Sequence, residues 1–476
     1  MRRDLSALRS GQFDLLVIGG GINGAGAARD AAMRGLRVAL VEQADFASGT
    51  SSRSSKLVHG GVRYLEQLDF KLVLEASLER RILLRIAPTL VRPLPFILPV
   101  YRADRRGART VQAGMWLYDA LSLFRNQRHR MLSAGEALRL EPSLNLEGLR
   151  GAALYYDAQM DDARLCLANV ISASQHGTVV ANYTRVSRLV RQGGRTAGAE
   201  VCDALGGDSF EVRAKHVINA AGPWLDDICA LDGPEPAKLR VTKGTHIIVP
   251  ALTQSHAITI QSSDERVVFV IPWHGFSLLG TTDTDYSGRP EDVRPNGQEV
   301  DFLLSEVKRI IPGHRLTSDD VLASFAGLRP LVRSGTSDSS QTPREERIYE
   351  SPSGLLSVAG GKFTTYRLTA KRVVDRISRA PCRTHLEALP AAGPPPDDLA
   401  LGAKWAVDEE MALTVEDVLR RRLGLALTPG QGLLEAETVA NMMAERLGWD
   451  QLGRQRQVEA YKRSLWLAGA AAVGTD

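Results

Sequence analysis

The sequence predicts an α/β protein with a Rossmann-like nucleotide-binding domain, a second domain built on an antiparallel sheet, and a small all-α domain at the C-terminal end. Three observations predict this fold class. A buried strand, a glycine-rich turn and a helix follow one another early in the chain, short strands cluster in its middle, and a proline-rich stretch at 390–396 precedes a helical region. The length of 476 residues exceeds what one hydrophobic core usually fills, so we expect at least two domains.

The first elements form one β-α-β unit. The continuous apolar run 13–18 predicts a parallel strand buried on both faces. The alanine-rich run 25–34 predicts a helix, and Gly35 is typical of a helix C-terminus. The apolar run 36–41 predicts the second strand.

A glycine-rich turn, Gly19-Gly-Gly21-Ile22-Asn23-Gly24, joins the first strand to the helix. In a G-x-G-x-x-G motif, the first glycine permits a tight turn, the second lets the backbone approach a pyrophosphate, and the third lets the helix pack on the sheet. Glu42 ends the second strand about 20 residues further on, where a carboxylate accepts hydrogen bonds from ribose hydroxyls. The unit therefore predicts a dinucleotide site, and the acid disfavours the 2′-phosphate of NADP.

Beyond this unit, apolar runs bounded by turn residues predict further strands, and longer stretches of helix formers predict helices. Expected strands cover 186–201 (a hairpin turning at 192–195), 216–222, 245–249, 267–272, 276–280, 321–331 and 355–361, and expected helices cover 163–174, 364–377, 409–423, 435–447 and 454–467.

Two later strands also end in small residues, at 219–224 and at 360–362. Three separate strands with glycine-rich ends fit a cofactor as long as FAD, which would stretch across the first domain. The strands in the middle of the chain then supply a sheet that covers the flavin.

Composition limits the remaining classes. The net charge of +4 is too small to indicate nucleic acid, but it suits an anionic substrate or membrane face. The four cysteines lie far apart without a CxxC pair, so we expect reduced thiols of a cytoplasmic protein and no metal site. We expect neither a signal peptide nor a membrane-spanning helix, because no sufficiently long apolar run is present.

Several longer motifs resemble those of the FAD-dependent, aerobic (respiratory) glycerol-3-phosphate dehydrogenases, in the family's order and over roughly 12–380. The motifs are Thr-Ser-Ser-Arg-Ser-Ser-Lys-Leu-Val-His-Gly-Gly-Val-Arg-Tyr-Leu-Glu at 50–66, Lys-Gly-Thr-His-Ile-Ile-Val-Pro at 243–250, Leu-Gly-Thr-Thr-Asp-Thr-Asp at 279–285, Gly-Leu-Arg-Pro at 327–330 and Gly-Gly-Lys-Phe-Thr-Thr-Tyr-Arg at 360–367. The resemblance implies oxidation of sn-glycerol 3-phosphate to dihydroxyacetone phosphate, with hydride transfer to non-covalent FAD and electrons passed to a membrane quinone.

The implied substrate is a phosphate dianion, which guanidinium forks and an ammonium group bind well. The residues that match the family's substrate pocket are Arg63, Tyr64, Arg329 and Lys362, with Arg344 as a weaker match. His246 matches a family histidine near the reacting carbon. Its imidazole is suited to take the hydroxyl proton, because its ordinary pKa lies near the operating pH; Lys362 is the next candidate.

The resemblance also implies the cofactor contacts outside the first unit. Besides Gly19, Gly21, Ile22, Asn23, Gly24 and Glu42, the expected FAD-binding residues are Thr50, Ser51, Ser52, Lys56, Leu57, His59, Gly222, Gly361, Lys362 and Thr364. For His59 we expect a packing or flavin contact, because the family holds FAD without a covalent bond. Asp283 and Asp285 are expected at a hairpin edge rather than in a metal site.

The expected organisation is a Rossmann-like FAD-binding domain, an antiparallel-sheet substrate domain and a shortened C-terminal helical domain. The FAD-dependent oxidoreductase region covers 12–389, with FAD-binding segments at about 12–90, 150–225 and 350–380, substrate-domain segments at about 91–149 and 226–349, a linker at 390–404 and the helical domain at 405–476. The front of the helical domain is missing relative to the family, which leaves a homodimer contact open.

Two alternatives remain: a glycerol-3-phosphate oxidase that uses oxygen, and a non-catalytic flavin-binding protein at a membrane surface. The family binds the inner face of the cytoplasmic membrane, and the stretch 101–130 suits such a role. Its apolar core, 115–124, is flanked by arginines, as in interfacial helices. These arginines are Arg102, Arg105, Arg106, Arg109, Arg125, Arg128 and Arg130.

Overall fold

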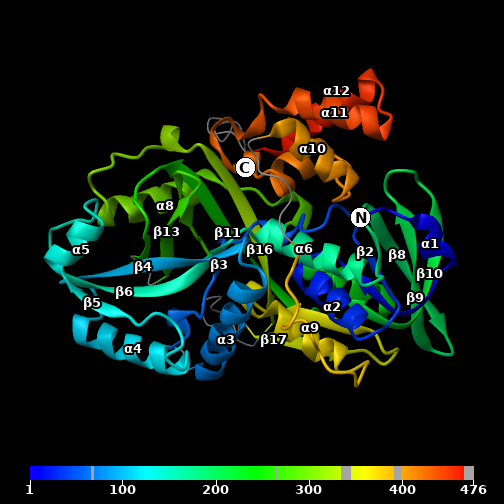
Figure 1. The fold of residues 1–476 in the computed structure, drawn as a ribbon, viewed down its shortest axis with the longest axis horizontal. Helices are drawn as coiled ribbons and strands as arrows, with labels where there is room; N and C mark the ends of the chain where they lie inside the picture. Colours follow the sequence, from blue (N-terminus) through cyan, green and yellow to red (C-terminus); the bar gives the residue numbers. More distant parts are fainter. Residues whose placement is uncertain (66–68, 263–265, 334–344, 391–397, 466–476) are drawn as a thin grey trace.

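The computed structural model describes residues 1–65, 69–262, 266–333, 345–390 and 398–465. The side chains of Arg63 and Tyr64 fall outside this description, as does the whole of Arg344. Within the described residues, the chain forms two large sheets side by side and a helical unit at one end (Figure 1). None of the helices in these ranges is long and apolar enough to cross a membrane.

The first sheet is parallel at its centre and contains the predicted β-α-β unit. Its strands, in spatial order, are β17 (Glu346–Glu350), β18 (Leu356–Gly360), β10 (Ser209–Asn219), β1 (Gln12–Ile18), β2 (Val38–Val41) and β7 (Val179–Ala181), with β9 (Arg195–Asp203) on β10 and β8 (Thr184–Gln192) on β9. The hairpin expected around 192–195 is confirmed.

Helices cover one face of the first sheet. They are α2 (Ile22–Met33), α6 (Asp162–Gln175) and α9 (Tyr366–Val374), which lie together in Figure 1. The small side chains of α2, such as Ala27, Ala28 and Ala31, let these helices approach closely. The opposite face packs against the β8–β9 hairpin and α1 (Leu5–Ser10), which explains why β1 is apolar at consecutive positions.

The second sheet is almost entirely antiparallel. Its strands, in spatial order, are β15 (Thr284–Asp285), β11 (Leu239–Pro250), β14 (Phe276–Gly280), β13 (Val267–Trp273), β12 (Ala257–Gln261), β4 (Val91–Tyr101), β6 (Leu149–Met160) and β3 (Leu57–Val58), with β16 (Ala323–Val332) on β11 and β5 (Arg130–Ser133) on β6. One face packs against α8 (Gly297–Ile310) and α5 (Ala134–Leu140), and the other against α4 (Ala108–Leu121) and α3 (Phe70–Ile86).

The division into segments differs from the expected one at three strands: β17, at the end of the expected substrate segment 226–349, pairs with β18 in the first sheet, and the other two are β6 and β3. β6 falls in the segment 150–225 and β3 in the segment 12–90, both of which were expected in the FAD-binding domain. Both strands pair in the second sheet instead, because β6 forms a long antiparallel ladder with β4 and a short one with β3. The chain therefore crosses between the two sheets more often than the motifs indicate.

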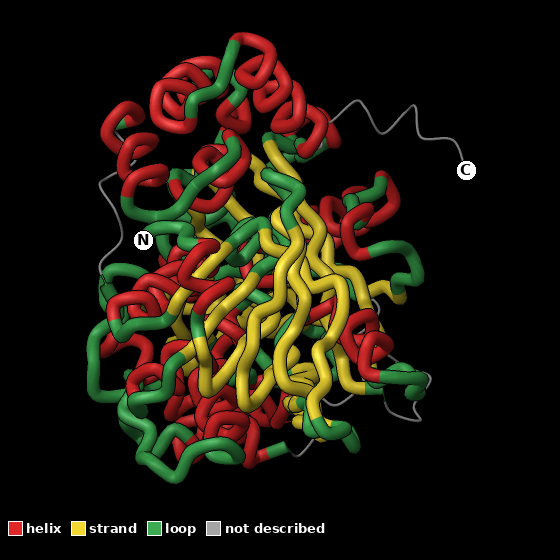
Figure 2. The backbone as a smooth tube through the Cα atoms, turned by 90° about the vertical axis from the view of Figure 1, so that its right-hand side faces the viewer, coloured by secondary structure: helices red, strands yellow, loops and turns green. Residues whose placement is uncertain are grey.

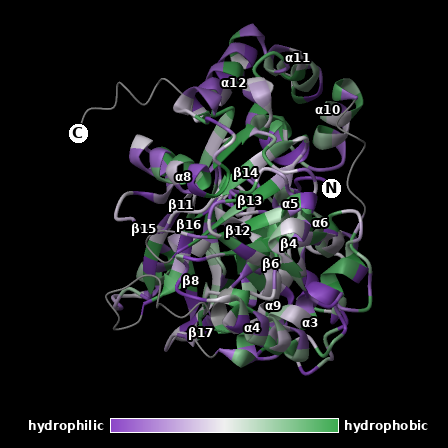
Figure 3. Ribbon diagram, turned by 90° about the vertical axis from the view of Figure 1, so that its left-hand side faces the viewer, coloured by the Kyte–Doolittle hydropathy of each residue, from purple (hydrophilic) through white to green (hydrophobic). Residues whose placement is uncertain are grey.

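The C-terminal unit is helical and has its own hydrophobic core. Its helices are α10 (Leu399–Asp408), a π-helical segment (Asp417–Arg422), α11 (Ala436–Leu447) and α12 (Gln451–Ser464). In Figure 2 these helices lie at one end of the molecule, above the strands. The outermost, α12, is largely hydrophilic (Figure 3), as expected for a helix with one buried edge.

Two expectations about this unit are wrong. The linker expected at 390–404 ends earlier, because Asp398 caps α10 by accepting a hydrogen bond from the backbone N–H of Leu401. The helix expected at 409–423 begins only at Val415, because α10 ends at Asp408 and Met411, with a φ of +57°, lies in a non-helical turn. The carboxylate of Asp417 then accepts the backbone N–H groups of Leu413 and Thr414 and starts this helix.

Candidate functional site

A cavity of about 540 Å³ opens at the carboxyl ends of β1, β10 and β18. Its walls include Gly19 and Gly21 after β1, Gly222 after β10 and Gly361 after β18. In open parallel sheets, ligands bind in the crevice at the carboxyl ends of the strands. The fold therefore brings the three glycine-rich turns together at one site.

Two glycines of the first turn have surroundings that exclude a side chain. Gly19 has a φ of +106°, and a Cβ there would lie 2.6 Å from the carbonyl oxygen of Ala220. A Cβ on Gly24 would lie 1.9 Å from the carbonyl oxygen of Gly19. By contrast, the nearest atom to a Cβ on Gly21 would be Ser51 Oγ at 3.2 Å, so space remains in front of α2 that fits a pyrophosphate.

Glu42 ends β2 on the wall of this cavity, and its carboxylate is fixed by the backbone. Oε2 accepts the N–H of Gly20 at 2.6 Å, and Oε1 accepts the N–H of Ala44 at 2.9 Å. Burial raises the pKa of Glu42, although these hydrogen bonds partly oppose the rise. The carboxylate thus links the glycine-rich turn to the end of β2, where a ribose hydroxyl donor is expected.

Most of the residues predicted to bind the cofactor line the cavity. They are Gly19, Gly21, Ile22, Asn23, Glu42, Thr50, Ser51, Leu57, His59, Gly222, Gly361, Lys362 and Thr364. Gly24, Ser52 and Lys56 do not line it. Lys56 points away because its Nζ donates to Asp162 Oδ1 at 2.5 Å and to the carbonyl oxygen of Ser52 at 2.8 Å, so it fixes the shape of the loop instead.

His246 lies on β11 at the side of the cavity formed by the second sheet. Its Nε2 lies 2.8 Å from Ser55 Oγ, and its ring stacks on Phe325 with a centroid distance of 4.9 Å. β14 places Gly280 directly opposite, where a Cβ would lie 2.1 Å from His246 Cδ2. Burial, and then the positive charge of Arg329, hold the pKa of His246 well below its ordinary value of 6.5, so the imidazole is neutral near pH 7.

Arg329 lies on β16 beside His246, and its guanidinium is held in one orientation. Nη1 donates to Asp283 Oδ1 at 3.1 Å, while Nη2 donates to Thr281 Oγ1 at 2.7 Å and to the carbonyl oxygen of Thr282 at 3.0 Å. Gly244 on the neighbouring β11 leaves room for it, because a Cβ there would lie 2.2 Å from Nη2.

A second cavity of about 530 Å³ lies between the second sheet and α4. Ser55, Leu57, His59 and Arg329 line both cavities, whereas His246 and Lys362 line the first cavity alone. Arg63 and Tyr64 were also predicted here, and their backbone lies in a short 3-10 helix, Val62–Leu65. Their side chains lie outside the described residues, as does Arg344.

Three further residues complete this geometry: Ser55, Gly244 and Gly280. All lie inside motifs that the sequence displays, at 50–66, 243–250 and 279–285. Their importance depends on which strands are neighbours, however, and the register of β11 with β14 and β16 could not be read from the chain.

Comparisons with known proteins identify relatives of this chain. A family model described as FAD dependent oxidoreductase matches residues 14–376, and a model described as the C-terminal domain of alpha-glycerophosphate oxidase matches residues 364–454. A glycerol-3-phosphate dehydrogenase of Synechocystis sp. is 36% identical, with 96% of this chain and 97% of that protein covered. An aerobic glycerol-3-phosphate dehydrogenase of Bacillus subtilis is 38% identical, with 79% and 68% covered.

Solved structures show the same fold. The glycerol-3-phosphate dehydrogenase of Bacillus halodurans complexed with FAD has a TM-score of 0.79 and 30% identity, with 96% of this chain and 95% of that chain covered. The L-alpha-glycerophosphate oxidase of Mycoplasma pneumoniae with FAD bound has a TM-score of 0.61 and 19% identity, with 77% and 94% covered, which shows a shared fold alone.

Proposed function

The chain belongs to the family of FAD-dependent glycerol-3-phosphate dehydrogenases, and from that premise we propose that it oxidises the C2 hydroxyl of sn-glycerol 3-phosphate to the ketone of dihydroxyacetone phosphate. FAD is the cofactor, and when bound it supplies the hydride acceptor. The residues of the chain bind the substrate, orient it and take its hydroxyl proton.

His246 is the proposed proton acceptor. A general base must be unprotonated at the operating pH and within reach of the proton. Its lowered pKa meets the first condition, and its place on the cavity wall supports the second. The contact between Nε2 and Ser55 Oγ, together with the stacked Phe325, fixes the ring so that one nitrogen has a defined direction.

Arg329 is the proposed anchor for the phosphate. A guanidinium offers five N–H donors in a rigid fork, so the contacts with Asp283 and Thr281 orient the group without exhausting it. Lys362 lines the cofactor cavity and adds a second positive charge at the site. Arg63 remains a proposed substrate residue on the resemblance alone.

The observation that carries the proposal is that His246 lines the cofactor cavity, while Arg329 and Ser55 lie where this cavity meets the second one. A proton acceptor and a phosphate anchor then lie together beside the cofactor.

An anaerobic titration tests the proposal. Glycerol 3-phosphate is added to the purified yellow protein, and bleaching of the flavin band is followed, with glycerol, dihydroxyacetone and lactate as matched alternatives. We expect rapid bleaching by glycerol 3-phosphate and far slower bleaching by glycerol, because loss of a charge-assisted contact costs roughly 2–5 kcal/mol. Equal rates for the two compounds would reject the phosphate anchor, and no bleaching by any of them would favour a non-catalytic flavin protein.

A membrane quinone is the proposed electron acceptor, with oxygen as the alternative. The enzyme family supports the first, whereas the second domain model takes its description from an oxidase. Reoxidation of the reduced protein distinguishes them. A short-chain quinone should restore the flavin band much faster than air-saturated buffer, and stoichiometric peroxide in air would show an oxidase.

Attachment to the inner face of the cytoplasmic membrane follows as part of this proposal, because quinones reside in the bilayer. α4 supports it. Met115 and Tyr118 face the second sheet and are buried, whereas Trp116 is 50% exposed and Phe124, just after the helix, is 47% exposed. An apolar outer face between arginines is what an interfacial helix presents to anionic lipid.

A further inference from the structure

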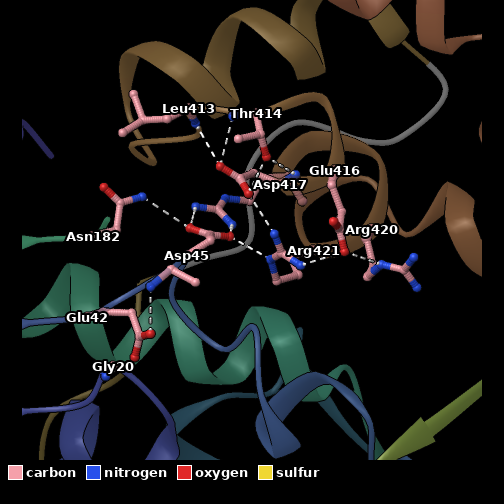
Figure 4. A network of polar contacts seen from close by, with 12 residues as sticks. Gly20, Glu42, Asp45, Asn182, Leu413, Thr414, Glu416, Asp417, Arg420 and Arg421 are labelled. Atoms are coloured by element: carbon pink, nitrogen blue, oxygen red, sulfur yellow. Dashed lines mark hydrogen bonds and ion pairs between the residues drawn. The ribbon is translucent and has the colours of Figure 1, made fainter. Parts of the chain in front are cut away.

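The C-terminal unit contacts the first domain at the segment 42–53, which runs from the end of β2 along the cofactor cavity. Glu42, Ser48 to Ser51 and Arg53 of this segment line the cavity. Asp45 does not; it is fully buried and points toward the C-terminal unit (Figure 4). The side of the segment that faces away from the cofactor is therefore covered by residues that come more than 350 positions later in the chain.

Asp45 is bound by two consecutive arginines of the π-helical segment. Arg421 Nε donates to Asp45 Oδ2 at 2.6 Å, and Arg422 donates to both carboxylate oxygens, at 2.5 and 3.0 Å. Asn182, after β7, adds a hydrogen bond to Oδ1 at 3.3 Å. Burial alone would raise the pKa of Asp45, but the two arginines outweigh it and lower the pKa, so the carboxylate is charged.

The arginines are themselves fixed from the other side. Arg421 Nη2 donates to Asp417 at 2.6 Å, and Asp417 also accepts the hydroxyl of Tyr183 at 2.8 Å. Arg422 Nη2 donates to the backbone carbonyl of Glu410 at 2.8 Å. A buried charge is stabilised only when its partners are fixed in position. Here, contacts other than those with Asp45 hold both guanidinium groups in place.

The far end of the segment is influenced by the same unit. Arg53 is partly buried beside the cavity, and among the residues that the structure describes no carboxylate forms an ion pair with it. The main negative charge that acts on it comes from Glu416, which pairs with Arg420 at 2.9 Å. The cavity-lining turn 48–51 thus lies between two residues, Asp45 and Arg53, whose electrostatic environment is set by the C-terminal unit.

Asp45 is also coupled to the glycine-rich turn through the backbone. Its carbonyl oxygen accepts the N–H of Ser48, and the N–H of Ala47 donates to Gly20 at 3.1 Å. Gly20 in turn donates its N–H to Glu42. Displacement of Asp45 would therefore move the turn 48–51 and the glycine-rich turn 19–24 together, although Asp45 itself does not line the cavity.

We propose that the C-terminal helical unit is a working part of the cofactor site: Arg421 and Arg422 hold Asp45, and Asp45 holds the segment 42–53 in the shape that binds FAD. Asp45 is a positioning residue. The helical unit therefore does more than add buried surface. Loss of its contacts with Asp45 should weaken FAD binding by more than the accompanying loss of stability explains.

A matched pair of variants tests this proposal. Asp45→Asn removes the charge that the two arginines hold. Arg164→Lys weakens a contact of similar burial between the same two units, the bidentate pair of Arg164 of α6 with Glu410 at 2.5 and 2.6 Å, and Arg164 does not line the cavity. The FAD dissociation constant is measured by titration of each apoprotein, together with the thermal midpoint of the apoprotein. No substrate is needed, so the outcome is independent of the proposed reaction.

We expect Asp45→Asn to raise the FAD dissociation constant by about tenfold or more, the order of effect seen when supporting groups behind a binding site are removed. Arg164→Lys should lower the thermal midpoint comparably and leave the constant within about twofold. Arg422→Lys keeps the charge but loses the two-point contact, so its FAD dissociation constant should lie between those of the other two variants. It also replaces Asp45→Asn in the comparison if that variant does not fold.

Two results would overturn the proposal. If Asp45→Asn and Arg164→Lys raise the dissociation constant equally, the contacts act only through stability. If Asp45→Asn or Arg422→Lys leaves FAD affinity unchanged while lowering the thermal midpoint, Asp45 joins the two units without shaping the cofactor site.

Discussion

His246 shows how burial sets the chemistry of a single residue. Its ring lies between Phe325 and the space left by Gly280, and two positive side chains, Arg329 and Lys56, act on it. Burial and these two positive charges disfavour the imidazolium. A residue held neutral in this way is ready to accept a proton at neutral pH, but it loses this ability as acid protonates it.

Replacing His246 with glutamine tests this role. The amide retains a hydrogen bond to Ser55 but cannot take a proton, so flavin reduction should slow by about 10²–10⁴-fold with little change in FAD affinity. Because the pKa of His246 lies below 6.5, the rate of flavin reduction by the wild type should decline only when the pH falls below 6.5. Stopped-flow reduction across pH measures both, with His314→Gln on the surface as the control. Unchanged reduction kinetics would move the proton acceptor elsewhere, with Lys362 next.

At the scale of elements, neighbouring strands place functional side chains by leaving space for them. β11 lies between β14 and β16, and the glycines of β11 and β14 each face a large side chain on the neighbouring strand. Gly244 faces Arg329, and Gly280 faces His246. The register of these strands thus positions the proposed proton acceptor, His246, relative to the proposed phosphate anchor, Arg329.

Gly244→Ala should test the position of Arg329 with little effect on the stability of the fold. The new methyl group would lie 2.2 Å from Arg329 Nη2 and 2.6 Å from Thr281 Oγ1, and both are ends of side chains that can move. We therefore expect a small change in thermal midpoint but a loss of about 10²-fold in kcat/KM, the order of effect of a misplacement near 1 Å. Gly135→Ala in α5, where a Cβ would have no neighbour within 4 Å, is the control. Full activity of Gly244→Ala would show that Arg329 need not be held there.

The elements that could be predicted from the sequence are those with local signals. The β-α-β unit, the 192–195 hairpin and the strands at 267–272 and 276–280 agree with β1, α2, β2, β8, β9, β13 and β14, because turn residues and buried apolar runs mark them locally. The break at Met411 gives no such signal, because it arises from contacts of Asp417 with Leu413 and Thr414. Lys56 was misplaced for a similar reason: its partner Asp162 lies more than 100 residues away.

α4 is the element on which the membrane proposal depends. Arg109 and Arg125 are exposed at either end of its apolar outer face. Neutralising both to glutamine should weaken binding to anionic liposomes by about an order of magnitude or more, since each basic residue near the surface contributes about 1 kcal/mol. Co-sedimentation at low and high salt measures this. Arg456→Gln with Arg463→Gln on α12 makes the same charge change elsewhere and should have no effect. Binding that ignores lipid charge, salt and both double variants would defeat the electrostatic model.

At the scale of the whole molecule, the site is a product of three units that meet. The first sheet supplies the glycine-rich turns, the second supplies His246 and Arg329, and the C-terminal unit secures the segment 42–53 through Asp45. The motifs of the first two units could be recognised in the sequence. The third contribution could not, because an isolated Arg421 or Asp45 resembles any surface charge until the fold buries it.

The buried charges between these units predict how the molecule responds to acid. Burial would raise the pKa of Glu416, but Arg420, Arg421 and Arg53 outweigh it and lower the pKa from 4.5 to about 2. A carboxylate whose pKa is lowered by folding contributes stability above its unfolded value. That contribution is lost as the pH falls from 4.5 through about 2, because protons then bind the unfolded chain first.

Glu416→Gln isolates this effect. The variant lacks the charge at every pH, so at neutral pH its free energy of unfolding should be lower than that of the wild type by about 1.5–3 kcal/mol, as for loss of a charge-assisted hydrogen bond. Below pH 4.5 the wild type should lose this advantage, and the two proteins should become equally stable as the pH approaches 2. Urea unfolding of both apoproteins over this range measures the difference. Glu437→Gln, an exposed carboxylate on α11, should show no such convergence. If the difference in free energy of unfolding between Glu416→Gln and the wild type stays constant with pH, Glu416 stabilises the protein through its shape rather than its charge.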